Sequence, residues 1–196
     1  LGPDGRMLFF SHQNMVEKHL NFARELLLKE ISQRFDTLFE GYLYWDAMVN
    51  AVSQGDVDFL EDQFEDMRES YGVQEILFEK EGVLLYRFGE PHVEDSLLAS
   101  LEPRKLRILF RKDHFDILQK LPLVFEDGAF SGFYALLRVE DLEVLRNINT
   151  FLGSHLAISE TPRGIPLEEG YFLRENDMAK SFFGNPLVRH LLLFSF

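Results

Sequence analysis

The chain has 196 residues, of which 46% are hydrophobic and 27% charged, enough apolar material for one core. Its 33 acidic residues outnumber its 20 basic residues and give a formal net charge of −13, which would repel nucleic-acid phosphates. We therefore expect no nucleic-acid partner. The absence of cysteine excludes disulfides, thiolate zinc sites, iron–sulfur clusters and a cysteine nucleophile.

The sequence contains no stretch of roughly 18 uncharged apolar residues, which a membrane-spanning helix needs, and no signal-peptide pattern at its start. It begins with Leu1 rather than methionine and ends with the apolar run 191–196. We therefore expect both ends to be cut from a longer chain. Residues 1–11 are turn-rich and are predicted to be a lead-in, and residues 12–196 are predicted to form a single domain.

The first predicted element is a long helix. From Val16 to Val52 apolar residues recur every three or four positions, which is the period of an α-helix. Only Gly41 interrupts this run, so one continuous helix of roughly 60 Å is predicted from about Gln13 to Ser53, with Gly55 as its stop. Such a length indicates a stalk, a dimer seam or both. The stripe is not a strict heptad, which favours packing on the chain's own sheet for the second half.

An acidic segment follows Gly55 and is predicted to be a short amphipathic helix. Its apolar positions have helical spacing: Leu60, Phe64, Met67 and Tyr71. Asp58 is predicted to cap the helix, with Glu61 completing a capping box. A calcium site would need an Asp-x-Asp-x-Asp-Gly loop, which is absent, and helical spacing spreads the carboxylates apart.

From Gln74 onward the pattern is that of strands. A hairpin is predicted from 76–78 and 83–88 around Gly82, followed by a loop and a helical turn over 97–101. Residues 105–111 alternate, which predicts a half-buried strand with Arg107 facing outward.

The later predicted elements are a turn at 112–113, a strand at 115–118, a hairpin of 121–125 and 130–138, a helix at 139–148, a strand at 156–158, a loop at 161–164 and a last strand at 187–196. These elements define an α+β fold, in which a long amino-terminal helix packs on a mostly antiparallel sheet. Such a sheet resembles the PAS-like extracellular sensor fold.

Several segments resemble one family in the same order. The segment Leu43–Val49, with its pair Trp45 and Asp46, is followed by 55–60 and the Gly82 hairpin. These resemble the fourth subclass of the CHASE-type extracellular sensor domains, in which a Trp-Asp pair closes a long helix. Two later parts also resemble that family: 121–123 with 130–138, its proline-containing and glycine-bearing strands, and 183–187, the start of its last strand. The resemblance covers about residues 12–196, and the wider double-Cache group is the alternative.

The resemblance implies a periplasmic or extracellular part of an inner-membrane receptor. It implies a transmembrane helix on each side and a cytoplasmic output such as a diguanylate cyclase, a phosphodiesterase or a histidine kinase. It also implies a homodimer in the full-length receptor.

The sequence contains none of the common catalytic motifs, such as a Gly-x-Ser-x-Gly elbow, a His-Glu-x-x-His pair, a phosphate loop or a dinucleotide fingerprint. His12 and His19 lie two helical turns apart, too far to chelate one metal ion. The other histidines are isolated in sequence: His92, His114, His155 and His190. We therefore predict no enzyme activity, no metal site and no cofactor.

A small-molecule ligand is the expected partner, and the concave face of the sheet is its expected site. Tyr134 and Arg138 share one strand face at even spacing, and Tyr86 and Arg107 lie on neighbouring predicted strands. These four are the candidate ligand-binding residues, and an arginine among them would suit a carboxylate ligand. The alternative is that both arginines are solvated and face outward.

The Trp-Asp pair has two interpretations. Trp45 lies on the apolar stripe of the long helix, which favours anchoring in the core over stacking on a ligand. Asp46 is expected to orient a neighbouring backbone or side chain rather than to act as an acid.

Three functions remain open from the sequence. The first is an extracytoplasmic sensory module, whose terminal helices transmit the state of a ligand or partner. The second is a cytoplasmic regulatory or scaffold domain that binds a protein through its acidic surface. The third is a hydrolase with an unrecognised site, which would require converging acids and bases with perturbed pKa values.

Overall fold

The computed structural model describes residues 3–111, 114–140, 142–168 and 170–176. The contacts divide the chain into two compact units. We call Lys29–Glu143 the sheet unit, and Leu1–Leu28 with Val144–Phe196 the terminal unit. The single domain over 12–196 stays a prediction. The predicted turn at 112–113, the segment 183–187 and the last strand at 187–196 lie outside the described residues.

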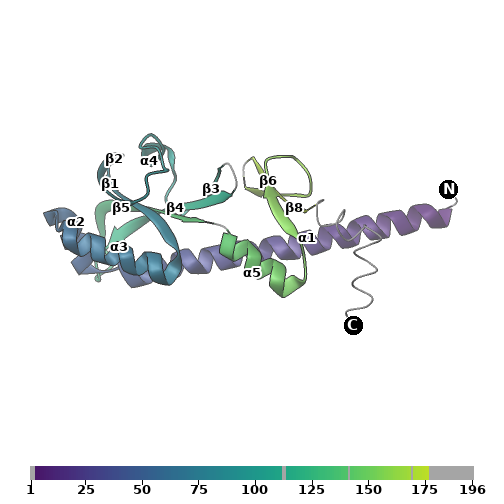
Figure 1. The fold of residues 1–196 in the computed structure, drawn as a ribbon, viewed down its shortest axis with the longest axis horizontal. Coiled ribbons are helices and arrows are strands. Elements are labelled where there is room, and N and C mark those ends of the chain that lie inside the picture. Colours follow the sequence, from purple (N-terminus) through teal and green to yellow (C-terminus); the bar gives the residue numbers. More distant parts are fainter. Residues whose placement is uncertain (1–2, 112–113, 141, 169, 177–196) are drawn as a thin grey trace. The chain divides into compact units, whose positions relative to one another are not determined.

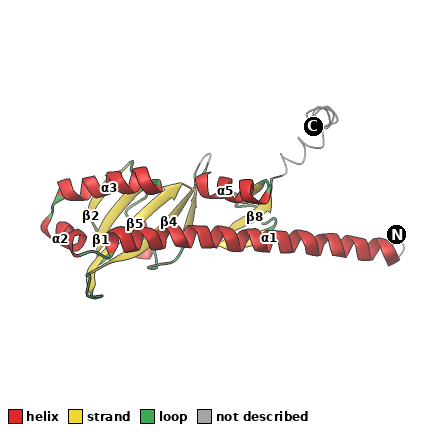
Figure 2. Ribbon diagram, turned by 90° about the horizontal axis from the view of Figure 1, so that it is seen from below, coloured by secondary structure: helices red, strands yellow, loops and turns green. Residues whose placement is uncertain are grey.

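The sheet unit contains a five-stranded antiparallel sheet in the order β2-β1-β5-β4-β3 (Figures 1 and 2). Its strands are β1 (Val73–Lys80), β2 (Val83–Gly89), β3 (Arg107–Phe110), β4 (Phe115–Val124) and β5 (Phe130–Glu140). The predicted α+β class and antiparallel sheet are therefore confirmed.

Two of the predicted strands are a single strand in the structure. The predicted segments 115–118 and 121–125 lie on one continuous strand, β4, although this strand contains Pro122. Proline lacks the amide hydrogen that a sheet ladder uses and is tolerated where a strand lacks a neighbour on one side. Because β3 pairs with β4 only as far as Leu118, Pro122 lies in such a part of the strand.

Helices α2 (Asp46–Gln54) and α3 (Val57–Tyr71) cover one face of this sheet, which we call the helix face (Figure 1). Their apolar sides are buried there, and the Phe64 ring of α3 stacks on Phe88 of β2 at 6.3 Å. The segment 89–106, with the short helix α4 (Leu97–Ser100), covers the opposite face.

The prediction of one continuous first helix is wrong in its start and in its continuity, whereas its stop at Gly55 is confirmed. Helix α1 begins at Pro3, inside the predicted lead-in, because proline is tolerated in the first turn of a helix. It ends at Leu38, and a π-helical turn, η1 (Phe39–Leu43), follows. Trp45 is then extended, with φ −158° and ψ 122°, and directly precedes α2. The helical run is therefore interrupted at Tyr44, which forms an isolated β-bridge with Val124 of β4.

The predicted stop of α2 and the predicted hairpin turn are confirmed, whereas the predicted cap of α3 is not. Gly55 ends α2 with a left-handed φ of 73°, and Glu81 and Gly82 form the hairpin turn with φ values of 52° and 80°. The cap of α3 is Asp56, whose side chain accepts a hydrogen bond from the amide of Phe59. The prediction of Asp58 as the cap is wrong, because α3 already starts at Val57 and Asp58 lies inside its first turn.

The terminal unit has its own small sheet, in the order β6-β8-β7. It contains α5 (Leu142–Leu152), β6 (Leu156–Ser159), β7 (Ile165–Glu168) and β8 (Tyr171–Glu175). Strand β6 was predicted, whereas β7 and β8 were not. Within this unit, His19 of α1 bonds the Ser154 hydroxyl at 3.0 Å.

Among the described helices, none combines the length and the hydrophobicity that a membrane span requires.

Candidate functional site

The sheet face opposite α2 and α3 carries an unusual number of buried charges, and we call it the charged face. Charged side chains are almost never fully buried unless they are paired. The buried charged residues are Glu75, Glu79, Asp116, Lys120 and Arg138.

Arg138 is the centre of this network. Its side chain is 1% exposed, and its guanidinium contacts Glu75 Oε1 at 3.0 Å and Asp116 Oδ1 at 3.3 Å. It also donates to the backbone carbonyl of Glu90 at 3.2 Å. The strand register explains the first contact, because Arg138 of β5 is the cross-strand partner of Glu75 of β1.

Glu75 connects the sheet to the covering segment. Its Oε1 accepts hydrogen bonds from the amides of His92 and Val93, both at 3.1 Å. Its Oε2 lies 3.2 Å from the Arg87 guanidinium. The carboxylate of Glu75 therefore holds the start of the segment 89–106 against β1.

A second buried pair holds the same segment further along. Lys120 Nζ lies 2.6 Å from Glu79 Oε1 and donates to the carbonyl of Leu98 in α4 at 2.9 Å. Between the two pairs an apolar cluster fills the space under the segment: Leu77, Val93, Leu98, Leu118 and Leu136. The face on which we expected a ligand is therefore occupied by the chain's own side chains.

The four candidate ligand-binding residues do not form one site. Arg107, Tyr134 and Arg138 lie on the charged face, on strands β3 and β5. Tyr86 lies on the helix face, because its partner is Phe78, and its hydroxyl lies beside Gly55. Arg138 is neither solvated nor available to a ligand, because its guanidinium is buried and fully paired. A ligand-binding role stays a prediction for Arg107 and Tyr134.

A group with metal-ligand spacing borders the charged face. One donor atom each of His114, Asp116 and Glu140 lies within 4.8 Å of the others. Both carboxylate oxygens of Asp116 face guanidinium groups, Oδ1 that of Arg138 and Oδ2 that of Arg111. This charge pattern is that of an ion-pair network, in which cations already neutralise the carboxylate.

Asp46 orients a backbone, as its place in the Trp-Asp pair suggested. Its Oδ1 accepts a hydrogen bond from the amide of Glu126 at 2.7 Å, which ties the start of α2 to the β4–β5 turn. The Tyr44 hydroxyl donates to the carbonyl of Glu126 at 3.1 Å and strengthens the same connection. Trp45 is only half-buried, and its ring lies 5.4 Å from that of Phe59.

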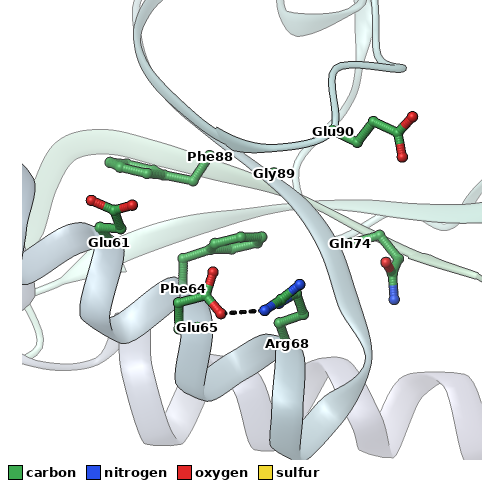
Figure 3. Close-up of a pocket in the computed structure, with 8 residues that line it drawn as sticks. All are labelled: Glu61, Phe64, Glu65, Arg68, Gln74, Phe88, Gly89 and Glu90. Atoms are coloured by element: carbon green, nitrogen blue, oxygen red, sulfur yellow. Dashed lines mark hydrogen bonds and ion pairs between the residues drawn. The ribbon is translucent and has the colours of Figure 1, made fainter.

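Two cavities lie away from the charged network. The first lies between α3 and the end of β2 and has a volume of about 230 Å³ (Figure 3). Its lining is Glu61, Phe64, Glu65, Arg68, Gln74, Phe88, Gly89 and Glu90. An ion pair at 2.5 Å between Glu65 and Arg68 runs along one side of it (Figure 3). Its volume is below the range of about 300 to 1,000 Å³ that is usual for ligand sites.

The second cavity has a volume of about 480 Å³ and lies at the break after α1; we call it the aromatic pocket. Its lining is Glu40, Gly41, Tyr42, Tyr44, Trp45, Gln63, Asp66, Tyr71 and Glu126. This pocket was not predicted from the sequence, because Trp45 was expected to lie on a continuous helix and to anchor the core. The available signal was three aromatic residues within four positions, at 42–45, which one regular helix would spread around its surface.

Two pKa values in and beside the aromatic pocket are raised. Burial of Tyr42, its hydrogen bond to the Asp66 carboxylate and the negative charge of Asp66 raise the pKa of its hydroxyl. Hydrogen bonding with the Asp46 carboxyl and the negative charge of Asp46 raise the pKa of the Glu126 carboxyl. Negative charge is therefore concentrated on this side of the sheet unit.

The architecture is a PAS-like α+β sheet with a long amino-terminal helix, and comparison with solved structures finds this fold in periplasmic domains. The periplasmic domain of Vibrio cholerae LuxQ matches with a TM-score of 0.51 and 13% identity, over 74% of this chain and 72% of that chain. A selenomethionine structure of the same domain matches with a TM-score of 0.50 and 12% identity, over 74% and 73%. No family model and no curated protein matches the chain. At such identities the likeness concerns the fold.

Proposed function

We propose that this chain is the extracytoplasmic sensory input domain of a transmembrane receptor and that it has no catalytic activity of its own. The observation that carries this proposal is the fold it shares with the periplasmic domains of LuxQ. The order of the segments that resemble CHASE-type domains is a second, independent support. The fourth CHASE subclass is the finer form of the proposal, with the double-Cache group as its alternative.

The proposed signal acts through the long first helix. Helix α1 has 36 residues and contributes to both units, since the sheet unit begins at Lys29. The Trp-Asp pair lies just beyond its carboxyl end, where Asp46 is bonded to the β4–β5 turn. A change at this end would reach the transmembrane helices that we propose to flank this domain in the receptor, and would bias the output domain, which we propose to be a diguanylate cyclase, phosphodiesterase or histidine kinase.

We further propose that the receptor is a homodimer. Met15 and Phe22, seven positions apart on α1, are 68% and 51% exposed. Large apolar residues two helical turns apart lie on one side of a helix, which suits a seam with a second copy. Equilibrium sedimentation of the receptor would test this, and a monomer at all concentrations would contradict it.

The location can be tested by cysteine labelling, because the chain has no cysteine of its own. Val83 is 63% exposed at the edge of the sheet, so Val83→Cys presents a reactive thiol on the folded domain. We expect a membrane-impermeant maleimide to label this variant of the full-length receptor in intact cells.

The matched control is Ala135→Cys, at a position that is 0% exposed in a central strand. It should be labelled only after denaturation, and the parent protein reports the background. Labelling of Val83→Cys only after lysis would contradict the proposal and would favour the cytoplasmic regulatory domain.

A further inference from the structure

The aromatic pocket has a one-sided chemical lining. Among the residues that the structure describes, nine line this pocket: four are aromatic, three are carboxylates, and none is a lysine, an arginine or a histidine. The aromatic residues are Tyr42, Tyr44, Trp45 and Tyr71, and the carboxylates are Glu40, Asp66 and Glu126. The volume of about 480 Å³ is in the range of small-molecule sites.

This chemistry selects organic cations. The negative faces of aromatic rings attract ammonium groups, with Trp the strongest partner, and cages of such rings recognise quaternary ammonium ligands. Carboxylates around the rings add attraction for the same charge. We propose that the aromatic pocket binds a small organic ammonium ion, with Trp45 and Tyr44 contacting its alkyl groups and Asp66 and Glu126 facing its charge.

The local structure holds these groups in place before any ligand binds. The π-helical turn and the extended Trp45 bring three aromatic residues to one side of the break. The Tyr42 ring packs edge-on against the Tyr71 ring, with 6.0 Å between the ring centres. The Tyr42 hydroxyl donates a hydrogen bond to Asp66 Oδ2, whereas Asp66 Oδ1 has no partner among the described contacts. Asp46 and Tyr44 fix the backbone of Glu126, and the Glu126 carboxyl group, which also hydrogen-bonds with the Asp46 carboxyl, lines the pocket.

A metal ion fits the pocket less well than an organic cation. Metal sites need three or more donor atoms close together, and among the described residues the group with that spacing is His114, Asp116 and Glu140, outside the pocket. The pocket carboxylates instead come from η1, α3 and the β4–β5 turn and share the lining with aromatic rings, whose faces offer a metal ion no donor atoms. Near this break, although outside the pocket lining, the Arg104 guanidinium stacks on the Phe39 ring at 4.5 Å, a cation–π contact within the chain.

The binding site stands on the pocket itself, whereas its use as a receptor input rests on the function proposed above. Cysteine labelling tests the location and the binding experiment tests the pocket, so the failure of one is distinguishable from the failure of the other.

The pocket contains its own probe, because Trp45 is the only tryptophan of the chain. Choline and tetramethylammonium chloride, titrated into the purified 196-residue chain, should change the Trp45 fluorescence in a saturable way. Two matched additions should leave it unchanged: 3,3-dimethylbutan-1-ol, the uncharged analogue of choline, and sodium chloride at the same ionic strength. Putrescine extends the series to primary ammonium groups.

Variants then assign the effect to named residues. Glu126→Gln removes the rim charge without touching the backbone bonds of Glu126, and Asp66→Asn keeps an acceptor for Tyr42. Each should weaken choline binding roughly two- to fivefold, as expected for the loss of one exposed opposite charge. Glu61→Gln, an equal charge change in the other cavity, is the matched control and should bind as the parent does.

Any one of three results overturns the proposal. The first is no saturable fluorescence change with any ammonium compound, and the second is an equal response to the uncharged analogue. The third is a loss of choline affinity in Glu61→Gln as large as that in Glu126→Gln. Saturation by putrescine alone would support the ammonium class and restrict it to primary amines.

Discussion

The charged face and the aromatic pocket belong to the same unit but use their charges in different ways. On the charged face, the buried carboxylates of Glu75, Glu79 and Asp116 each contact a buried lysine or arginine. In the aromatic pocket, three carboxylates share one cavity with aromatic rings, and none of the described residues that line it is basic. The difference shows that buried, paired charges stabilise the fold itself. Carboxylates that line a cavity without basic neighbours can instead interact with a ligand.

The comparison also changes where a ligand is expected. The sequence placed it on the sheet face around Arg138, where an arginine would suit an anion. That arginine instead holds the segment 89–106 through the carbonyl of Glu90. The carboxylates that line a cavity are negative instead. One of them, Glu126, lies in the β4–β5 turn, where Asp46 accepts a hydrogen bond from its backbone amide.

The largest expected effect comes from breaking the charged face at Arg138. Arg138→Met keeps most of the apolar stem but removes the one fully buried cation that Glu75 and Asp116 share, so that Glu75 is left facing the partly exposed Arg87 and Asp116 the partly exposed Arg111. We expect the free energy of unfolding to fall by about 3 to 5 kcal/mol, measured by urea denaturation followed by circular dichroism.

The matched control for this variant is Arg68→Met, which breaks the ion pair with Glu65. The two side chains of that pair are 50% and 45% exposed, so its loss should cost only about 0 to 1 kcal/mol. If Arg138→Met and Arg68→Met have similar stability, the charged face is not the structural network described above.

A smaller effect is expected at Lys120. Lys120→Met removes the ion pair with Glu79 and the bond to the Leu98 carbonyl, but Glu79 keeps its hydrogen bond from the Gly82 amide at 2.7 Å. We expect a loss of about 2 to 4 kcal/mol and faster amide hydrogen exchange in α4. Lys105→Met, which breaks a pair that is 63% and 75% exposed, should change neither quantity. Unchanged exchange in α4 would show that Lys120 does not hold the covering segment.

The sequence predicted local structure well because the responsible signals are local. Gly82 required a turn, and the apolar spacing around Phe64 required an amphipathic helix. The break at Tyr44 was not predicted, because a single glycine, Gly41, is tolerated inside a helix and no proline follows it before Tyr44. The buried positions Leu38, Leu43 and Met48 also continue the same stripe across it.

The candidate sites were less predictable, because their members are distant in sequence. Arg138 lies 63 positions from Glu75 and 22 from Asp116, and only the strand register brings them together. Alternation placed Arg138 on the correct strand face but could not show that the segment 89–106 covers that face. The aromatic pocket likewise combines η1, α3 and the β4–β5 turn. Asp46 was predictable, because a side chain beside a helix start commonly bonds a neighbouring backbone.

On the pocket side, Tyr42 should make stability depend on alkaline pH. The pKa of its hydroxyl is raised in the folded protein by burial and by Asp66, so the unfolded chain releases this proton first as pH rises above about 10. The stabilisation that Tyr42 contributes is therefore present below about pH 10 and is lost as the pH rises above it. Above that pH, we expect the free energy of unfolding of the parent protein to fall by up to about 1.4 kcal/mol per pH unit more than that of Tyr42→Phe, measured by urea denaturation. Parallel pH profiles would contradict this coupling.

The smallest effect is expected at Asp46, where the bond is partly exposed. Asp46→Ala leaves the amide of Glu126 without its acceptor at 2.7 Å and should reduce the free energy of unfolding by about 1 kcal/mol. Because the same bond positions Glu126 at the pocket rim, choline binding should also weaken. Asp46→Asn keeps an acceptor oxygen and should restore both quantities, measured by urea denaturation and Trp45 fluorescence. If Asp46→Ala lowers stability but leaves choline binding unchanged, the β4–β5 turn does not position the ligand, and Glu126 is not part of the site.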